Sequence, residues 1–381
     1  MQADRSDSRR HARVRPGSAL AIAVALLAFA ATSASAFGAA KAPIAVRVVV
    51  VTTWEFEPGG RDITGELHAW RTRWPLETQM PFPTGVHPLL YDARRHVLAI
   101  LTGVATARAA ASIMALGLDP RFDLTDAYWV VAGTAGVDPK AASIGSAAWA
   151  RFVVDGDLGQ EIDARDMPPD WLTGILPNGR TTPYELPAPA ARNEDGNVAY
   201  ALNRGLVDWA YARTRDIKLL DTASLARVRA AYAGPGAAPP LVLEGDGLMS
   251  ARFWYGDHLN QWAERWVPYW TGGQGVFAMS AEEDTGIMQA LTLLARAGRA
   301  KLDRVLILRA GSDYTVGPPG MTAADFLAKE AHGALPANRE ALDALYTVAS
   351  PIVRALADDW VHTRATPPGS QPGPPHRPTG G

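Results

Sequence analysis

The chain of 381 residues contains no cysteine, so neither disulfides nor thiolate metal sites can stabilise it. A hydrophobic core must supply the stability instead, and a chain of this length is ample for one. After Phe37 no run of residues approaches the roughly 18 consecutive apolar residues that indicate a membrane span. Beyond that point the sequence therefore predicts no stable membrane insertion.

An excess of positive charge is also missing. The formal net charge is −2, and it becomes −5 without residues 1–36, which hold five Arg and two Asp. A nucleic-acid-binding domain usually carries a basic patch, and binding to an anionic membrane surface needs clustered Lys and Arg. This balance of charge predicts neither kind of partner.

The first 36 residues have the three parts of a secretory signal. Four arginines between residues 9 and 15 come first, and the 13 apolar residues Ala19–Ala31 follow. That apolar stretch is shorter than the roughly 20 residues that a spanning helix needs. Small residues at Ala34-Ser35-Ala36 form a cleavage site, so we expect a mature protein beginning near Phe37, periplasmic or secreted. An uncleaved N-terminal anchor is the alternative.

Apolar segments rich in β-branched residues alternate with helical segments over most of the chain. Strands are predicted at 44–53, 96–102, 126–132, 147–154, 241–244 and 304–310, and helices at 105–116, 197–214, 224–232, 258–266, 283–297, 323–330 and 341–360. This order predicts an α/β fold with a mostly parallel central sheet, which binds ligands at the carboxyl ends of its strands.

Proline sets several of the expected boundaries. Pro268 should end the helix before it, and Pro351 should kink or split the last helix. We expect one domain over residues 37–363 and a disordered tail rich in Pro and Gly over residues 364–381.

The strand predicted at 304–310 leads into Arg309 and Asp313 at its carboxyl end. An Asp that is partly desolvated at this edge of a sheet can act as a general acid. The simpler interpretation is that Asp313 caps a turn or the following helix, a common role for Asp.

Three consecutive carboxylates, Glu282, Glu283 and Asp284, stand where a helix is predicted to begin. Carboxylates are favoured in a first helical turn because they interact with free N–H groups and the helix dipole. A carboxylate in this position can equally accept both hydroxyl groups of a ribose. The residues alone leave both interpretations open.

Six blocks of sequence together resemble the purine nucleoside permease family and, through it, the superfamily of nucleoside phosphorylases and nucleosidases. The blocks are Phe122–Thr125, Ala132–Pro139, Ile144–Arg151, Glu161–Pro168, Met279–Gly286 and Arg309–Tyr314. The resemblance covers most of residues 44–360. It implies a three-layer α/β sandwich of the nucleoside phosphorylase type, with a mixed, mostly parallel central sheet flanked by helices. It also implies a purine nucleoside as ligand, and a homodimer.

The resemblance assigns roles to residues that match the superfamily's motifs. Asp313 would protonate or hydrogen-bond purine N7, with Ser312 and Arg309 in the same motif and Arg309 orienting the nucleophile or its base. Glu283 would hold the 2′- and 3′-hydroxyls of the ribose. Glu282 replaces the methionine that usually precedes this glutamate.

Further residues are implied to contact the substrate. Met279 is a candidate to pack on the sugar, although Met is more often part of a core. Thr102 and Gly103 match a turn after the second strand, where Ala105 replaces a usual glycine. Trp254, in a run of three aromatic residues, is a candidate to stack on the base, although aromatics too are more often core. The eight His residues have no metal-ligand spacing, so neither a metal nor a cofactor is expected.

The loop after the first strand decides between water and phosphate as the nucleophile. Phosphorylases place an Arg there, whereas Glu57 aligns with the carboxylate that activates water in the hydrolytic branch. A carboxylate in that place repels phosphate and polarises water. Arg61 and Arg108 are near enough in the predicted arrangement to leave inorganic phosphate open as a co-substrate.

The resemblance therefore implies an exported purine nucleosidase that hydrolyses the N-glycosidic bond, with phosphorolysis as the variant. An alternative from another class is a nucleoside-binding protein that takes part in uptake. A permease proper needs membrane spans, which the chain after residue 37 lacks, so a transport role would be indirect.

Overall fold

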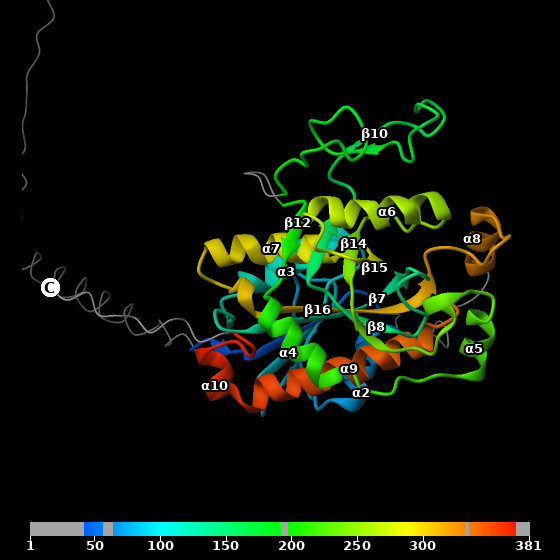
Figure 1. Ribbon diagram of the computed structural model, residues 1–381. Helices are drawn as coiled ribbons and strands as arrows, with labels where there is room; N and C mark the ends of the chain where they lie inside the picture. Colours follow the sequence, from blue (N-terminus) through cyan, green and yellow to red (C-terminus); the bar gives the residue numbers. More distant parts are fainter. Residues whose placement is uncertain (1–41, 56–63, 192–196, 332–334, 371–381) are drawn as a thin grey trace, which may run out of the picture. The chain divides into compact units, whose positions relative to one another are not determined.

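The computed structural model describes residues 42–55, 64–191, 197–331 and 335–370. The chain divides into two units, and the unit that begins at Ile44 holds every helix and strand that the structure describes (Figure 1). The predicted signal over residues 1–36 lies outside the described residues, as does the tail after residue 370.

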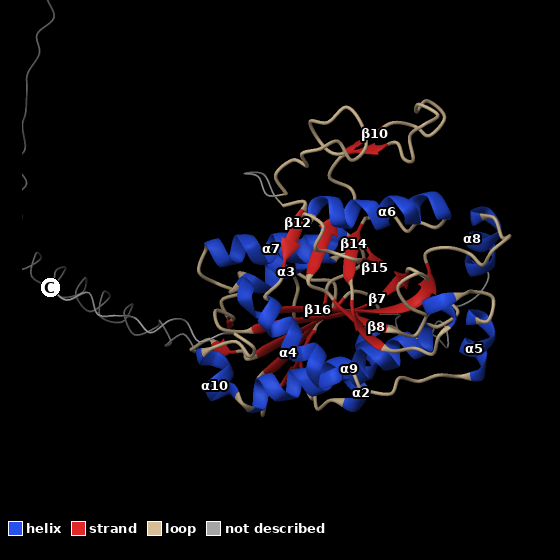
Figure 2. Ribbon diagram, viewed as in Figure 1, coloured by secondary structure: helices blue, strands red, loops and turns tan. Residues whose placement is uncertain are grey.

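A mixed sheet forms the centre of this unit (Figure 2). Its main path follows the order β12 (Ala199–Ala201), β9 (Phe152–Asp155), β14 (Asp246–Met249), β15 (Phe277–Ala281), β7 (Tyr128–Val137), β2 (Val48–Thr52), β5 (Val97–Leu101), β4 (Leu89–Asp92) and β3 (Thr78–Met80). The three strands β7, β2 and β5 are parallel, and β2 and β5 are buried on both faces. That burial explains their continuous apolar sequences and confirms the predicted α/β fold with a mixed central sheet.

Seven strands close into a small barrel, and four of them, β7, β9, β14 and β15, also belong to the main path of the sheet. β16 (Val305–Tyr314) pairs with β7 on one side and with β8 (Ala147–Trp149) on the other. β8 leads into β9 and β13 (Val242–Glu244) leads into β14, and the two bent strands pair with each other in parallel. β15 then joins β14 to β7 and closes the ring. A closed ring leaves these strands without exposed edges.

The bend between β8 and β9 corrects one prediction. A single strand was expected over residues 147–154, but the chain turns at Ala150 and Arg151. The buried carboxylate of Asp246 accepts hydrogen bonds from the backbone N–H groups of Arg151 (2.9 Å) and Phe152 (2.7 Å). These bonds satisfy the amides that the bend removes from the ladder.

Helices cover both faces of the sheet (Figure 2). α3 (Thr106–Gly117) packs against α7 (Asp284–Arg296) on one side, and α9 (Asn338–Asp358) lies along β16 and β7 on the other, beside α2 (Glu66–Arg73). The remaining elements are β1 (Ile44–Ala45), β6 (Phe122–Asp123), β10 (Gln160–Glu161), β11 (Ile175–Leu176), α4 (Arg204–Thr214), α5 (Ala223–Arg229), α6 (Asp257–Trp270), α8 (Ala323–Ala331), α10 (Trp360–Ala365) and two short 3₁₀ helices, Gly234–Ala237 and Leu302–Arg304.

The helix end expected before Pro268 was wrong, because α6 continues to Trp270 with Pro268 inside it. A kink or a split was expected at Pro351, and α9 passes through that residue without splitting. In α6 the buried side chains of Trp262, Trp266 and Trp270 pack in one aromatic cluster. Tertiary packing of this kind supplies most of a helix's stability in a folded protein and outweighs one missing hydrogen bond.

Two other boundaries also differ from the predictions. The helix expected over residues 197–214 begins only at Arg204, after strand β12, and the side chain of Asn203 caps it by accepting a bond from Leu206 N. At the other end of the chain, α10 extends to Ala365, two residues beyond the predicted end of the domain at residue 363.

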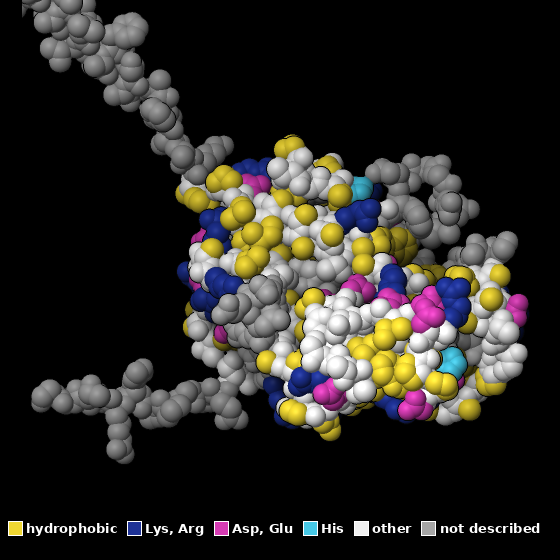
Figure 3. Space-filling view, turned by 90° about the horizontal axis from the view of Figure 1, so that it is seen from above, with side chains coloured by type: hydrophobic (Ala, Val, Ile, Leu, Met, Phe, Trp, Pro, Cys, Tyr) yellow, Lys and Arg dark blue, Asp and Glu magenta, His cyan; other side chains and the backbone are white. Residues whose placement is uncertain are grey.

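The surface seen in Figure 3 carries acidic and basic side chains mixed with apolar ones, without a continuous field of one sign. In the described parts of the chain, no helix has both the length and the apolar character that crossing a bilayer requires.

Candidate functional site

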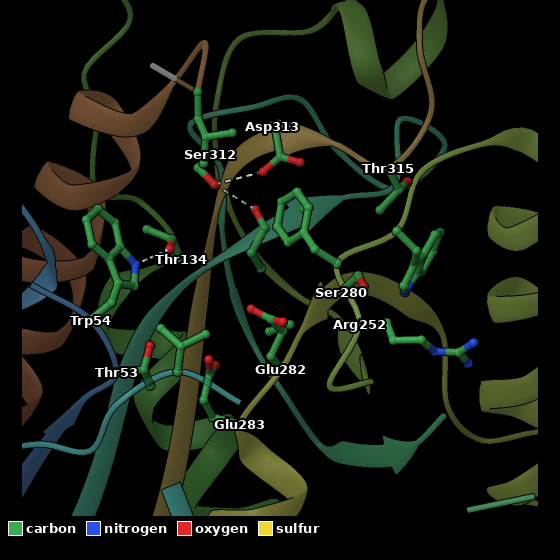
Figure 4. A pocket seen from close by; sticks show the side chains of 17 residues that line it. Thr53, Trp54, Thr134, Arg252, Ser280, Glu282, Glu283, Ser312, Asp313 and Thr315 are labelled. Atoms are coloured by element: carbon green, nitrogen blue, oxygen red, sulfur yellow. Dashed lines mark hydrogen bonds between the residues drawn. The ribbon is translucent and has the colours of Figure 1, made fainter. Parts of the chain in front are cut away.

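A pocket opens at the carboxyl ends of β2 and β16, beside β7 and the junction of β15 with α7 (Figure 4). It is lined by Thr53, Trp54, Val104, Thr134, Ala135, Gly136, Arg252, Phe253, Trp254, Ser280, Ala281, Glu282, Glu283, Ser312, Asp313, Thr315 and Leu335. Because β2, β7 and β16 run parallel, their carboxyl ends bring segments that are distant in sequence together here. This is the edge at which open α/β sheets bind ligands. Of the predicted site residues, the pocket brings together Asp313, Ser312, Glu283 and Trp254.

Asp313 and Ser312 line the pocket together although they are consecutive residues. The pairing of β16 with β7 shifts register between Gly311 and Asp313, and such a bulge re-aims side chains that would otherwise alternate between faces. Asp313 is 1% exposed, and its Oδ1 lies 2.9 Å from the Ser312 hydroxyl, which donates to it. Asp313 lies within strand β16 and not at the start of a helix.

The carboxylate of Glu283 is held from two sides. Its Oε1 accepts a hydrogen bond from the Ala105 N–H (3.2 Å), and its Oε2 accepts one from Arg309 Nη2 (2.9 Å). Glu283 occupies the N-cap position of α7, but its side chain makes no capping bond. Helix capping thus does not account for this residue, whereas an orientation fixed at the pocket wall does.

Arg309 lies behind the pocket and does not line it. Its guanidinium, 2% exposed, makes two hydrogen bonds to Asp284, one to Glu283 and one to the backbone oxygen of Thr134. Although burial lowers the pKa of Arg309, Asp284 and Glu283 raise it more, so the group stays charged. Arg309 was predicted as a catalytic residue that orients the nucleophile or its base; the structure shows it bonded to Glu283 and Asp284 instead, which gives it a positioning role toward Glu283.

Glu66, the first residue of α2, was missed in the sequence. Its Oε2 accepts bonds from the N–H (2.6 Å) and hydroxyl (3.0 Å) of Thr53, and its Oε1 accepts bonds from the N–H (2.7 Å) and hydroxyl (3.2 Å) of Thr134. Both threonines line the pocket, so Glu66 fastens the end of β2 to β7. In the sequence Glu66 cannot be told from an ordinary acidic residue of a first helical turn.

Glu66 and Arg309 approach each other beside Gly133. A Cβ at that glycine would lie 2.3 Å from Arg309 Nη1 and 3.2 Å from Glu66 Oε1, so a side chain there would displace the ion cluster. Burial raises the pKa of Glu66 from 4.5 to about 7, with Glu283 adding to this effect and Arg309 opposing it. The cluster of Glu66, Glu283, Asp284 and Arg309 thus contains one carboxyl that changes charge near neutral pH.

Three predicted contact residues lie elsewhere. Met279 is 1% exposed in the core and does not line the pocket, whereas the two residues that follow it on β15, Ser280 and Ala281, do. Thr102 and Gly103 are also outside the lining. The Thr102 hydroxyl lies 3.3 Å from the backbone oxygen of Thr52, so this residue supports the turn and not a ligand.

The aromatic part of the pocket differs from the prediction in detail. Trp254 lines it but also stacks against Phe277, with ring centroids 6.3 Å apart, and so belongs to the cluster on α6. Phe253 lines the pocket too and is 55% exposed. Trp54, which the sequence did not single out, is anchored by a 2.9 Å bond from its Nε1 to the Thr134 hydroxyl.

The charges around the pocket are mostly negative. Among the described lining residues Arg252 is the only cation, and Figure 4 shows it directed away from Glu282 and Glu283. Arg108 donates to the backbone oxygen of Val104 and does not line the pocket. Glu57 and Arg61 lie outside the described residues. No group of three or more His, Asp and Glu within the described ranges could hold a metal ion.

Ala105, whose N–H donates to Glu283, has a strained backbone conformation. Its φ of 74° and ψ of 155° lie in a region that is essentially restricted to glycine, at a cost of about 1–3 kcal/mol. Ala105→Gly should therefore raise the free energy of unfolding by about 1 kcal/mol, less than the strain because glycine gains entropy in the unfolded chain. Urea unfolding measures the change. The control is Ala111→Gly, at an exposed position within α3, which should lose about 1 kcal/mol. If both variants lose the same free energy of unfolding, the backbone at Ala105 is not strained.

Solved structures similar to this chain include a nucleosidase and a hydrolase. The 5′-methylthioadenosine/S-adenosylhomocysteine nucleosidase of Neisseria meningitidis is 14% identical, with a TM-score of 0.47 over 80% of this chain and 99% of that one. The futalosine hydrolase of Helicobacter pylori is 10% identical, with a TM-score of 0.48 over 81% and 97%. Identity and TM-score are both low, so nothing about the activity of this chain follows from them.

Sequence relatives are closer. A probable purine nucleoside permease of Schizosaccharomyces pombe is 30% identical over 276 residues, which are 71% of this chain and 78% of that protein. A purine nucleoside permease of Candida albicans is 29% identical over 287 residues, 74% of this chain and 69% of that protein. The family model for purine nucleoside permease (NUP) matches residues 45–366, which include every residue that lines the pocket. The chain therefore belongs to the purine nucleoside permease family.

Proposed function

We propose that this chain is an exported purine nucleosidase, which hydrolyses the N-glycosidic bond of purine ribonucleosides in its pocket. The observation that carries the proposal is that Asp313 and Glu283, from strands and loops far apart in sequence, line one pocket with both carboxylates oriented by neighbours. Membership of a family named for purine nucleosides supports the substrate class. Export is proposed from residues 1–36, and recovery of a chain that begins near Phe37 from outside the cytoplasm would test it.

Cleavage of an N-glycosidic bond builds positive charge on the ribose ring and negative charge on the departing purine. A proton that Asp313 supplies to N7 neutralises the purine, so the bond to C1′ breaks more easily. Glu283 accepts hydrogen bonds from ribose hydroxyls and stabilises the positive charge on the ring. Arg309 keeps Glu283 in one orientation, so little reorganisation is needed during the reaction.

Water is proposed as the nucleophile, not phosphate. Two carboxylates besides the proposed acid, Glu282 and Glu283, line the pocket, and the one cation in the described lining is directed away from both. A phosphate dianion would be repelled by such an environment, whereas water is tolerated. The resemblance assigns the activation of water to Glu57, which lies outside the described residues.

A second candidate function is nucleoside binding during uptake. The relatives with the highest identity given above are named permeases, and this name favours a part in transport. A binding protein would use the same pocket and would hold the nucleoside intact.

Incubation of the purified protein with inosine or adenosine, with and without phosphate, separates these functions. Free purine and free ribose without phosphate are expected for hydrolysis. If ribose 1-phosphate forms, and only when phosphate is present, the reaction is phosphorolysis and not hydrolysis. If the nucleoside binds but no free base appears under either condition, the enzyme proposal is wrong and the binding function remains.

A further inference from the structure

Glu282 is the pocket carboxylate that the functions assigned so far leave unused. It stands between the end of β15 and the start of α7, and its backbone oxygen is fixed by a 2.8 Å bond from the Thr106 hydroxyl. Its side chain lines the pocket, and Figure 4 shows the carboxylate directed into the pocket between Glu283 and Asp313. The backbone is thus held in place while the carboxylate faces the space that a ligand would occupy.

The neighbouring carboxylates are already engaged. Glu283 is bonded to Ala105 and Arg309, and both oxygens of Glu66 accept bonds from threonines. By contrast, no residue in the described part of the chain donates a hydrogen bond to the Glu282 carboxylate, which is half-buried. A carboxylate that faces a pocket without such a donor is available to accept a proton or hydrogen bond from what enters.

We propose that Glu282 is the general base that removes a proton from the attacking water, an inference that rests on the proposed nucleosidase function. The water oxygen forms a bond to C1′ as the bond from C1′ to the purine nitrogen breaks, and that electron pair leaves with the purine. One proton passes from water to Glu282 and one from Asp313 to purine N7. The net reaction consumes one water and yields free ribose and free purine, so no other reactant is needed.

The charges that face Glu282 favour this role at neutral pH. Burial raises its pKa from 4.5 to about 7, and the negative charges of Glu283 and Asp157 add to the effect. Arg309, on β16, opposes it. A general base works best when its pKa lies near the operating pH, since it is then largely ionised and still basic. Activity limited by Glu282 should fall as the pH drops below about 7, because the carboxylate becomes protonated.

The experiment compares kcat of wild type, Glu282→Gln and Glu282→Asp for release of purine between pH 5 and pH 9. Glu282→Gln keeps the shape but cannot take a proton, so we expect kcat at pH 8 to fall about 10²–10⁴-fold and the acidic limb of the profile to vanish. Glu282→Asp should retain a weaker activity with an acidic limb. In Glu282→Ala, added formate should restore part of the rate. Glu77→Gln, an exposed carboxylate outside the pocket, is the matched control.

The variant Glu57→Gln tests the competing hypothesis that Glu57 is the general base. If Glu282→Gln keeps the rate and pH profile of wild type while Glu57→Gln loses the acidic limb, Glu57 is the base and the inference is wrong, although the nucleosidase function stands. If wild type releases no purine, the function itself fails. Circular dichroism and nucleoside binding of each variant identify a folding defect, and restoration of the Ala variant by formate tests the base independently of that defect.

Discussion

Replacing Asp313 with Asn should lower kcat for purine release by about 10²–10⁴-fold, with little change in the Kd for the nucleoside. The amide has the shape of the carboxyl group and can still donate a hydrogen bond to N7, so binding persists. It cannot give up a proton to the departing purine, so stabilisation that arises only in the transition state is lost. Steady-state kinetics with inosine and adenosine, together with calorimetric Kd values, measure both effects.

Ser312→Ala is the matched control for this substitution. It removes the hydroxyl that donates to Asp313 Oδ1 at 2.9 Å but leaves the acid in place. One such bond contributes about 1 kcal/mol, so kcat should fall by no more than about tenfold. If Asp313→Asn weakens binding and turnover to the same degree, Asp313 has a structural role and the proposed acid must be another group.

Much of the fold followed from local patterns in the sequence. Val48–Thr52 and Val305–Leu308 are buried on both faces, and their continuous apolar character predicted central strands correctly. The barrel could not be predicted, because it depends on pairings between distant segments. On either side of the bend at Ala150 and Arg151, β8 pairs with β16 and β9 pairs with β14. Pairings between distant segments leave no periodic signal in one sequence.

The candidate site divides in the same way. Asp313 and Glu283 lie in sequence motifs that could be recognised, and the structure places both at the pocket. Met279 lies one residue before the part of β15 that reaches the pocket and is buried in the core, and the sequence does not show where along the strand the pocket begins. Glu66 had no signal at all, since its importance comes from Thr53 and Thr134, 13 and 68 residues away. Only the folded chain brings these donors to one carboxylate.

Replacing Arg309 with Met should lower the free energy of unfolding by about 3–5 kcal/mol, because it leaves buried carboxylates without their cation. Glu283, Asp284 and Glu66 are 3%, 0% and 3% exposed, so water cannot replace the guanidinium. The loss should also depend on pH. The pKa of Glu66 rises from 4.5 to about 7 on folding, so its contribution is fully present below pH 4.5 and is lost as the pH rises through 7. Arg309 limits that loss, so the variant should be weakened more at pH 8 than at pH 5.

Arg304→Met separates this electrostatic effect from the cost of removing any buried arginine. Arg304 is 2% exposed like Arg309, but its guanidinium donates to the backbone oxygens of Asp126, Thr363 and Arg364 and not to carboxylates. Its removal should destabilise the protein by a similar amount at both pH values, because no buried carboxylate loses its counter-charge. Urea unfolding at pH 5 and pH 8 measures both variants. An equal loss for Arg309→Met at the two pH values would show that the guanidinium acts there through packing and backbone bonds, and not through its charge beside Glu66.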